Sequence, residues 1–441
     1  MANFAKPDGP RFSVDVYQNE YLPEGGSQVD AIVTVTASGG GTLGGAPAPG
    51  RPSAAVAVMV DCSGSMDYPP AKMRGAREAT AAAIDTLRDG TRFAVIGGTH
   101  VAQEVYPGGG RLAVADATTR EQAKQALRRL SAGGGTAIGT WLRLADRLLS
   151  AADVTIRHGI LLTDGRNEHE SPEELRATLD ACAGRFTCDA RGVGTDWDVK
   201  EVTGVASALL GTADIVADPA GLAADFTRMM ETAMGKEVAD VALRVWTPLG
   251  ATLRFVKQVA PAVEDLTHRR TGAGPRAGDY PTGSWGDESR DYHLSVTVPP
   301  AGLGQEMLAA RVSLMVPQPD GTVQNLGAQG LVRAVWTDDM AASTAMSPQV
   351  AHYTGQAELA QAIQQGIDLR KAGDFDGATA KLGRAVQLAD ASGNADTAKL
   401  LAKVVDVVDA ATGTVRLKTR VTEADEMTLE TRSTKTVRVK K

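Results

Sequence analysis

AAVAVMVDCSGSM, residues 54–66, is an apolar run that ends in an acid followed by two serines. Residues 54–60 show no alternation of polar and apolar side chains, which predicts a strand buried on both faces, as in the centre of a parallel α/β sheet. The polar residues that follow then lie at the carboxyl end of this strand. In open α/β sheets that is where ligands bind.

Strand and helix patterns alternate from this stretch onward. The apolar residues of 71–88 recur at helical spacing and stop before Gly90, and capping boxes are expected at Thr118 with Glu121 and at Ser171 with Glu174. Patterns of buried strands recur in RFAVIGG (92–98), RHGILLTDG (157–165), FTCDARGVG (186–194) and ADIVADP (213–219). This alternation predicts an α/β fold with a doubly wound, mostly parallel sheet over residues 52–235.

In the segments on both sides of residues 52–235, the hydrophobicity of the side chains repeats with a period of two residues. Residues 10–38 and 237–340 alternate apolar and polar side chains, which indicates half-buried antiparallel strands. A linker rich in glycine and proline, GGGTLGGAPAPGR at 39–51, separates the first of these segments from the α/β part. We expect a single β-sandwich formed by residues 10–38 and 237–340 and interrupted by the α/β domain.

The remainder of the chain returns to helical periodicity. GDFDGATAKLGRAVQLA, residues 373–389, resembles the second half of a tetratricopeptide repeat, so residues 350–412 are expected to form an α-helical, tetratricopeptide-like segment. Residues 413–441 are polar, charged and free of aromatic side chains, which predicts a disordered tail. A kinase could reach its hydroxyls, which belong to Thr428, Thr431, Ser433, Thr434 and Thr436. Once phosphorylated, they could recruit a phosphothreonine-binding partner. A solvated tail that only aids solubility is the alternative.

Composition narrows the class of protein. The 441 residues carry a formal net charge of −7, which argues against a nucleic-acid binder, and 43% are hydrophobic, which is ample for packed cores. The chain has neither an apolar run of transmembrane length nor the apolar core of a signal peptide, so we expect a cytoplasmic protein with no membrane contact. The three cysteines, Cys62, Cys182 and Cys188, are expected to be reduced core thiols.

Three polar clusters could meet at the rim of the predicted sheet. Asp61, Ser63 and Ser65 alternate along the first loop, Thr136 lies in GGGTAIG (133–139), and Asp164 ends the buried strand of LLTDG. Carboxylate and hydroxyl oxygens are hard donors, which suit Mg²⁺.

In this order and spacing, DCSGSM, GGGT and TDG resemble the von Willebrand factor A domain with an intact metal-ion-dependent adhesion site, of the bacterial intracellular type. The resemblance covers about 180 residues of the α/β domain, whose fold is Rossmann-like. It implies that Mg²⁺ or Mn²⁺ is bound, and that a carboxylate from a partner protein completes the coordination. The implied metal ligands are Asp61, Ser63, Ser65, Thr136 and Asp164.

Enzymatic alternatives have weaker support in the sequence. An aspartyl phosphatase commonly needs a second acid two residues after the first, where this chain has Ser63, and neither a phosphate-binding Gly-x-x-x-x-Gly-Lys-Ser/Thr loop nor a Gly-x-Ser-x-Gly elbow occurs. His169, between two glutamates, is expected to be a solvated loop residue.

We therefore expect a non-enzymatic interaction protein in a bacterial stress or signalling system. For the family type that it resembles, an AAA-type ATPase, a kinase or phosphatase, or a phosphothreonine-binding protein is the expected partner. A metal-dependent hydrolase using the same acids, and a structural subunit of a larger assembly, stay open as alternatives.

Overall fold

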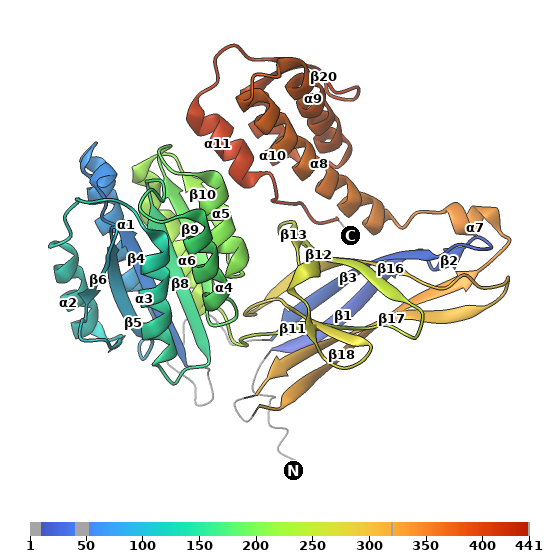
Figure 1. Ribbon diagram of the computed structural model, residues 1–441, viewed down its shortest axis with the longest axis horizontal. Helices are drawn as coiled ribbons and strands as arrows, with labels where there is room; N and C mark the ends of the chain where they lie inside the picture. The colour runs from blue at the N-terminus through green and yellow to red at the C-terminus, as the bar shows by residue number, and fades with distance from the viewer. Residues whose placement is uncertain (1–9, 40–52, 319–320, 440–441) are drawn as a thin grey trace. The chain divides into compact units, whose positions relative to one another are not determined.

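The structure is a computed structural model that describes residues 10–39, 53–318 and 321–439 (Figure 1). The linker predicted at 39–51 lies, except for Gly39, outside these residues. The described chain divides into two compact units. Residues 10, 53–239 and 283–286 form the first, and residues 11–39, 240–282, 287–318 and 321–439 form the second.

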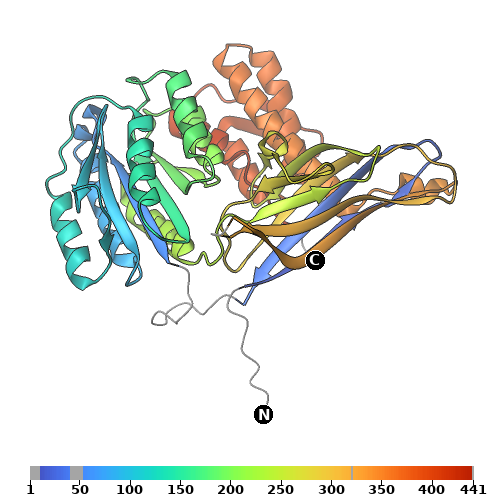
Figure 2. The same cartoon turned by 60° about the horizontal axis from the view of Figure 1, so that its bottom comes forward.

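The first unit is built on one mixed sheet, in the strand order β10-β9-β8-β4-β5-β6, with β7 also paired to β5. Strands β10, β9, β8, β4 and β5 are parallel, whereas β6 and β7 run antiparallel to β5. Helices lie on both faces of this sheet (Figures 1 and 2). The strands are β4 (Ala54–Asp61), β5 (Arg92–Gly98), β6 (Ala102–Tyr106), β7 (Ala113–Val114), β8 (Ile156–Thr163), β9 (Thr187–Val193) and β10 (Ala213–Val216).

The helices of this unit follow the predicted alternation with the strands. They are α1 (Ala71–Thr86), α2 (Ala117–Leu127), α3 (Ile138–Ser150), α4 (Pro172–Cys182), α5 (Val199–Ala208) and α6 (Leu222–Met234), with the short 3₁₀ helices η1 (Gly64–Asp67) and η2 (Pro219–Gly221). The capping box of Ser171 with Glu174 is confirmed at the start of α4. The box expected at Thr118 and Glu121 is wrong, because Asp116 caps α2 and pairs with Thr119.

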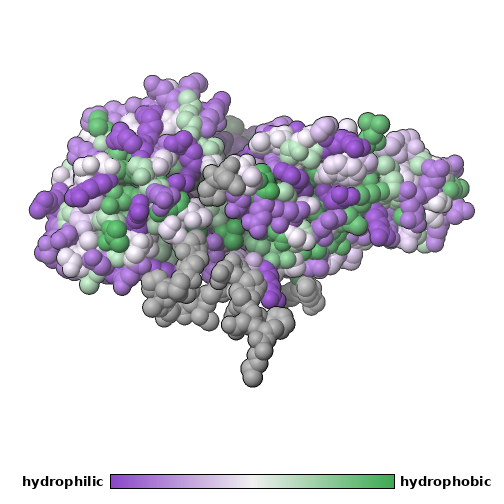
Figure 3. All heavy atoms as spheres, turned by 90° about the horizontal axis from the view of Figure 1, so that it is seen from below, coloured by the Kyte–Doolittle hydropathy of each residue, from purple (hydrophilic) through white to green (hydrophobic). Residues whose placement is uncertain are grey.

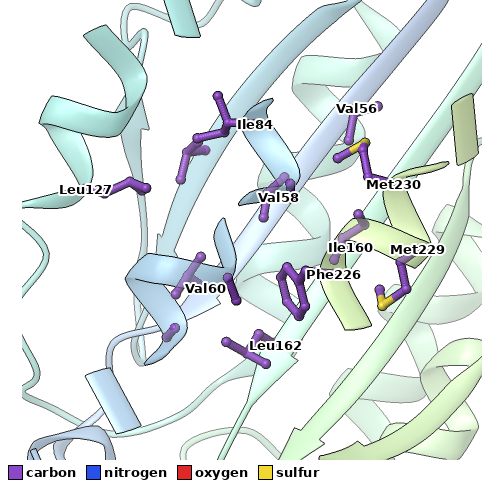
Figure 4. Close-up of a cluster of buried hydrophobic side chains, with 14 of the residues drawn as sticks. Val56, Val58, Val60, Ile84, Leu127, Ile160, Leu162, Phe226, Met229 and Met230 are labelled. Carbon is purple, nitrogen blue, oxygen red and sulfur yellow. The ribbon is translucent and has the colours of Figure 1, made fainter. Parts of the chain in front are cut away.

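Strand β4 is buried on both faces, as its unbroken apolar sequence predicts. Val56, Val58 and Val60 lie in one core cluster with side chains of β8, α1, α2 and α6, among them Ile160 and Phe226 (Figure 4). Helix α3 contacts β4 as well. Full burial of one such side chain contributes about 1.5–3 kcal/mol, so this packing holds the end of β4, and the polar loop after it, in place.

The second unit contains two sheets that are almost entirely antiparallel. One has the order β1-β3-β16-β12-β13, and the other β14-β15-β11-β17-β18-β2, in which only β18 and β2 are parallel. Strand β3 pairs with β16 from Gln28↔Thr297 to Ala37↔Glu288, so segments on either side of the first unit in the sequence share a sheet. Between the two sheets, β1 lies against β18: a Cβ atom on Gly330 would be 2.7 Å from the side chain of Val16.

The bounds of these strands agree with the segments of alternating sequence. They are β1 (Arg11–Gln18), β2 (Tyr21–Leu22), β3 (Gln28–Ser38), β11 (Ala242–Trp246), β12 (Thr252–Ala260), β13 (Glu264–Asp265), β14 (Thr271–Gly272), β15 (Ala277–Pro281), β16 (Glu288–Thr297), β17 (Glu306–Pro317) and β18 (Val323–Trp336), with the 3₁₀ helix η3 (Thr267–Arg269) between β13 and β14.

Helices follow the last strand of the second unit, as the helical periodicity predicts. They are α7 (Met340–Thr344), α8 (Pro348–Lys371), α9 (Phe375–Ala391), α10 (Ala395–Val404) and α11 (Glu423–Arg432), with a hairpin of β19 (Val405–Asp409) and β20 (Thr414–Leu417) between α10 and α11. Helices α8, α9 and α10 share a core cluster with this hairpin and α11.

The disordered tail expected at 413–441 is wrong over residues 413–439. Val415 and Leu429 are buried in the helical core cluster, and Met427 is buried too. These few apolar residues are spaced so that β20 and α11 can bury them, although the average composition of the segment is polar. Packing against the preceding helices therefore supplies the apolar burial that the isolated segment lacks.

Several hydroxyls of this segment are also buried or hydrogen-bonded. Thr431 and Ser433 are buried, and the Thr436 hydroxyl donates to the carbonyl of Val259 over 2.6 Å. The backbone of Thr434 accepts a hydrogen bond from Val263, although its side chain is exposed. The expectation of an unstructured tail is therefore wrong over residues 413–439, whereas phosphorylation of this segment stays a prediction.

Arg438 anchors the end of the described chain. Its guanidinium donates two hydrogen bonds, of 2.6 and 2.9 Å, to the carboxylate of Asp291 on β16, which is 2% exposed and also accepts from Thr34 and Tyr353.

Arg438→Ala is expected to lower the free energy of unfolding by about 1–2 kcal/mol, because it leaves the buried Asp291 carboxylate without its cation while the arginine itself is partly solvated. Urea unfolding measures this loss. The control is Lys399→Ala, whose ion pair is exposed, and equal unfolding midpoints for the two variants would contradict the prediction.

No helix in the described ranges is long and apolar enough to cross a membrane. On the face shown in Figure 3, hydrophilic and hydrophobic residues are interspersed.

Cys62, Cys182 and Cys188 are buried free thiols, as expected, and burial raises the pKa of Cys62 to about 12.

Candidate metal site

The loops that carry the three polar clusters are tied together by backbone hydrogen bonds. The N–H of Gly64, after β4, donates to the carbonyl of Gly134 over 2.9 Å, and the N–H of Gly133 donates to Cys62 over 2.8 Å. The N–H of His169, after β8, donates to the carbonyl of Thr136 over 3.0 Å. The glycine-rich loop is thus held between the other two, which fixes the position of its threonine.

The hydroxyls of Ser63, Ser65 and Thr136 converge on one point. A Cβ atom built on Gly165 would lie 3.1 Å from Ser65 Oγ, 3.2 Å from Thr136 Oγ1 and 3.6 Å from Ser63 Oγ. Any side chain at residue 165 would therefore fill the space that the hydroxyls surround. Ser63 Oγ is 2.9 Å from Ser65 Oγ, which in turn donates to Asp164 Oδ1 over 2.7 Å.

Asp61 lies beneath the hydroxyls with no exposed surface. Its Oδ1 accepts from the N–H of Ser63 over 2.7 Å, and its Oδ2 accepts from the Thr163 hydroxyl over 2.6 Å. Burial raises the pKa of this carboxyl to about 6, against the lowering effect of its hydrogen bonds from Ser63 and Thr163, and the nearby charge of Asp164 raises it further. Both oxygens are oriented, and the charged form is costly in the absence of a cation.

Asp164 is fully buried and faces a cation from the chain itself. Lys72, at the second position of α1, places Nζ 2.8 Å from Asp164 Oδ2 and 3.0 Å from Asp196 Oδ2. Burial alone would lower the pKa of this ammonium, but hydrogen bonds and charges from the two aspartates outweigh it and raise the pKa. Lys72 is therefore charged.

The first N–H groups of α3 do not point freely into the site. The N–H of Ile138 donates to Asn167 Oδ1 and that of Gly139 to Glu170 Oε2, each over 2.8 Å. These bonds fix α3 to the third loop instead. The ring of His169 packs over Gly135, where a Cβ atom would come within 1.9 Å of the ring, so residue 135 has to be glycine.

The hydroxyls open into a cavity of about 610 Å³. It is polar and carries both signs of charge, and it is lined by Ser63, Gly64, Ser65, His100, Gly134, Gly135, Thr136, Gly165, Arg166, Glu168, His169 and Asp196. The rings of His100 and His169 lie at its rim with centroids 5.9 Å apart. His169 thus lines the cavity from an exposed loop position, in agreement with the solvated loop residue that the sequence indicated.

The donors fit a small, hard cation. Neighbouring ligands of octahedral Mg²⁺, at bond lengths of about 2.0–2.1 Å, lie about 2.9 Å apart, which matches the 2.9 Å between Ser63 Oγ and Ser65 Oγ. In residues 10–39, 53–318 and 321–439, no three His, Cys, Asp or Glu side chains form a possible metal cluster. A set of two carboxylates and three hydroxyls suits Mg²⁺ or Mn²⁺.

The structure brings together all five residues that the sequence singled out, and adds Thr163 and Lys72. Thr163 was hidden because it ends a buried strand and reads as a core residue. Lys72 carried a signal: a cation in the first turn of a helix opposes the helix dipole, so it needs an acidic partner.

Two sequence profiles match the chain. That of the von Willebrand factor type A domain matches residues 54–215, and that of the von Willebrand factor type A C-terminal domain matches residues 387–433. The second match extends across residue 413 into β20 and α11. No curated protein is similar enough in sequence to match.

Solved structures extend the match to the whole chain. The structure described as von Willebrand factor type A from Catenulispora acidiphila is 50% identical, has a TM-score of 0.92, and covers 100% of this chain and 99% of its own. The ArnB paralog VWA2 from Sulfolobus acidocaldarius (14% identity, TM-score 0.60, 96% and 98% covered) and the human COPII-coat protein Sec24c (12%, 0.52, 87% and 57%) share the fold alone. With half of its residues identical to the Catenulispora protein over its full length, the chain belongs to the von Willebrand factor type A family.

Proposed function

We propose that this protein is a non-enzymatic, metal-dependent protein–protein interaction protein that captures an acidic residue of a partner. Von Willebrand factor type A domains commonly mediate protein interactions. The observation that carries the proposal is the convergence of three hydroxyls from two loops beside Gly165, with two buried carboxylates next to them. The proposed adhesion site for Mg²⁺ or Mn²⁺ consists of Asp61, Ser63, Ser65, Thr136 and Asp164.

The ion, when bound, would offer a partner's carboxylate an open coordination position. The chain's own residues prepare that position. Ser63 and Ser65 present hydroxyl lone pairs from the first loop, and Thr136 presents one from the second. Asp61 supports the first loop through the Ser63 N–H, and Asp164 supports it through the Ser65 hydroxyl.

The hydrogen bonds of Asp61 favour a role in binding over a role as a catalytic nucleophile. Both oxygens of Asp61 accept hydrogen bonds within the protein, which leaves this carboxylate poorly placed to act as a nucleophile. A metal-dependent hydrolase using the same acids is the alternative. Turnover of a generic phosphoester with Mn²⁺, abolished by Asp61→Ala, would replace the binding proposal by that one.

We place the protein among bacterial, intracellular members of the family, in a stress or signalling system, beside an AAA-type ATPase, a kinase or phosphatase, or a phosphothreonine-binding protein. The similarity to a Catenulispora protein supports a bacterial source. In this proposal the two antiparallel sheets form one sandwich, which acts with the C-terminal helices as a scaffold for the α/β unit.

Thr136→Val is expected to weaken metal-dependent partner capture about tenfold or more, because it removes one hydroxyl donor of the site and preserves the shape of the side chain. The free energy of unfolding should change by no more than about 1 kcal/mol. A pull-down from lysate of the native cells, with Mn²⁺ or with a chelator, measures the capture, and urea unfolding measures the stability.

Thr140→Val serves as the matched control, because the Thr140 hydroxyl donates to the carbonyl of Ala137, the residue that precedes α3. A partner retained in chelator, or retained equally by both threonine variants, would contradict the metal-dependent capture.

A further inference from the structure

Lys72 is a cation built into the proposed metal site. Its side chain reaches from the first turn of α1 and is 8% exposed, so little water solvates the ammonium. Nζ lies 2.8 Å from the carboxylate of Asp164, which has no exposed surface, and within 3.5 Å of the backbone carbonyl of Ser65. The ammonium thus contacts two of the residues around the proposed ion.

The surroundings of this lysine explain why it stays in the site. Asp164 and Asp61 are both buried, and a buried carboxylate without a cation is costly. Lys72 neutralises one of the two charges, and its second partner, Asp196, lies at the solvent side with its side chain 66% exposed. The chain therefore carries its own partial substitute for a divalent ion.

We propose that Lys72 is a resident counter-cation of this site, which weakens binding of the divalent ion to the free protein and strengthens capture of an anionic partner by the loaded protein. The inference deepens the proposed function and rests on it. It makes Lys72 a positioning and specificity residue, since it acts on the partner through the charge of the site.

The two effects follow from the charges. With Lys72, the two buried aspartates carry one net negative charge, so a divalent ion is attracted less than it would be by two. Once the divalent ion is bound, the ion, Lys72 and the two buried aspartates together carry one net positive charge. Without Lys72, the ion and the two aspartates would be neutral. An acidic side chain arriving at the site is therefore attracted more strongly when the lysine is present.

The predicted signature is a pair of opposite changes in Lys72→Met, which keeps most of the apolar stem and removes the charge. We expect Mn²⁺ alone to bind about tenfold or more tightly, because a like charge within a few ångströms is lost. Acetate, as a minimal carboxylate probe, should enhance Mn²⁺ binding less in this variant than in the wild type. In chelator the variant should melt at a lower temperature, because both aspartates then lack a cation.

Isothermal titration with Mn²⁺, with and without acetate, and thermal unfolding in chelator test the inference on the full chain. Lys124→Met is the matched control, since Lys124 lies on α2 of the same unit and pairs with the exposed Asp85 and Glu121. It should match the wild type in Mn²⁺ and acetate titrations. If Lys72→Met does not fold, Lys72→Gln, which keeps a hydrogen-bond donor without the charge, is measured in its place.

The outcomes separate the two proposals. If the wild type binds Mn²⁺ and the Lys72 variants bind it equally or more weakly, the resident-cation role is overturned and the metal site stands. If neither the wild type nor the variants bind Mn²⁺, the proposed function is overturned together with the inference. Tighter Mn²⁺ binding with a smaller acetate effect, in the Lys72 variants alone, supports both.

Discussion

Asp61→Asn is expected to lower the affinity for Mn²⁺ by about a hundredfold or more and to leave the protein folded. The side chain keeps its size and an oxygen that can accept from Ser63 or Thr163, but the site loses one of its two buried carboxylates. Isothermal titration with Mn²⁺ measures the affinity. Wild-type protein should also gain thermal stability from Mn²⁺, by mass action, whereas the variant should not.

In chelator the same variant is expected to be more stable than the wild type at pH 7, by about 1–3 kcal/mol. The pKa of Asp61 is raised by burial from 3.8 to about 6, so between these values the folded protein holds a proton that the unfolded chain has lost. The wild type therefore loses stability as the pH rises through this window, and the loss persists above it. Asparagine does not ionise, so the difference between the two proteins should vanish below about pH 4.

Asp67→Asn is the matched control for both measurements, because Asp67 lies in the same loop with an exposed side chain. Unchanged Mn²⁺ affinity in Asp61→Asn would reject Asp61 as part of a metal site. If Asp61→Asn in chelator at pH 7 has a lower free energy of unfolding than the wild type, the buried charge of Asp61 does not destabilise the fold, and the stability prediction is wrong.

Deletion of residues 1–38 is expected to abolish soluble folding of the chain. It removes β1 and β3, and β3 contributes Ile32, Val33 and Val35, all fully buried. Loss of these side chains costs about 1.5–3 kcal/mol each, which together approaches the net stability of a typical domain. The deletion also removes one of the two partners of β16, along ten residue pairs, and such an open strand edge promotes aggregation.

Point variants show whether the effect comes from β3 itself. Ile32→Asp should reproduce much of the loss, because it places a charge in the cluster of Val259 and Tyr353. Asp15→Asn, on the exposed side of the edge strand β1, should behave as the wild type. Expression followed by size-exclusion chromatography measures soluble, monodisperse protein, and a deletion variant that elutes and melts as the full chain does would contradict the role of β3.

The sequence predicted the fold of the first unit and the residues of the candidate site because both depend on local patterns. Unbroken apolar runs such as residues 54–60 bury on both faces of a sheet, and the acids Asp61 and Asp164 directly follow such runs. Strands that run parallel end at the same edge of the sheet, so an acid at each end is enough to predict that the two meet.

Caps were harder to place, since several side chains near a helix start can accept the same N–H groups. No Ser, Thr, Asp or Asn immediately precedes Ser171, and the prediction of its capping box is confirmed. At the start of α2, both Asp116 and Thr118 could cap the helix, and Asp116 is the N-cap. The fate of residues 413–439 was misjudged for a related reason: average polarity hides the few side chains, such as Leu429, that a neighbouring helix can bury.

Periodicity and motif order along the chain thus determine the strands, the helices and the acids and hydroxyls at the strand ends. Only the tertiary structure decides which of those side chains contact one another. The contacts of Thr163 with Asp61 and of Ser65 with Asp164 join residues about a hundred positions apart, and Lys72 reaches Asp164 through a long, flexible side chain. Such contacts depend on how loops pack against one another, which leaves no period in the sequence. The sequence can therefore indicate that Lys72 needs an acidic partner, but only the tertiary structure decides that this partner is Asp164 in the candidate site.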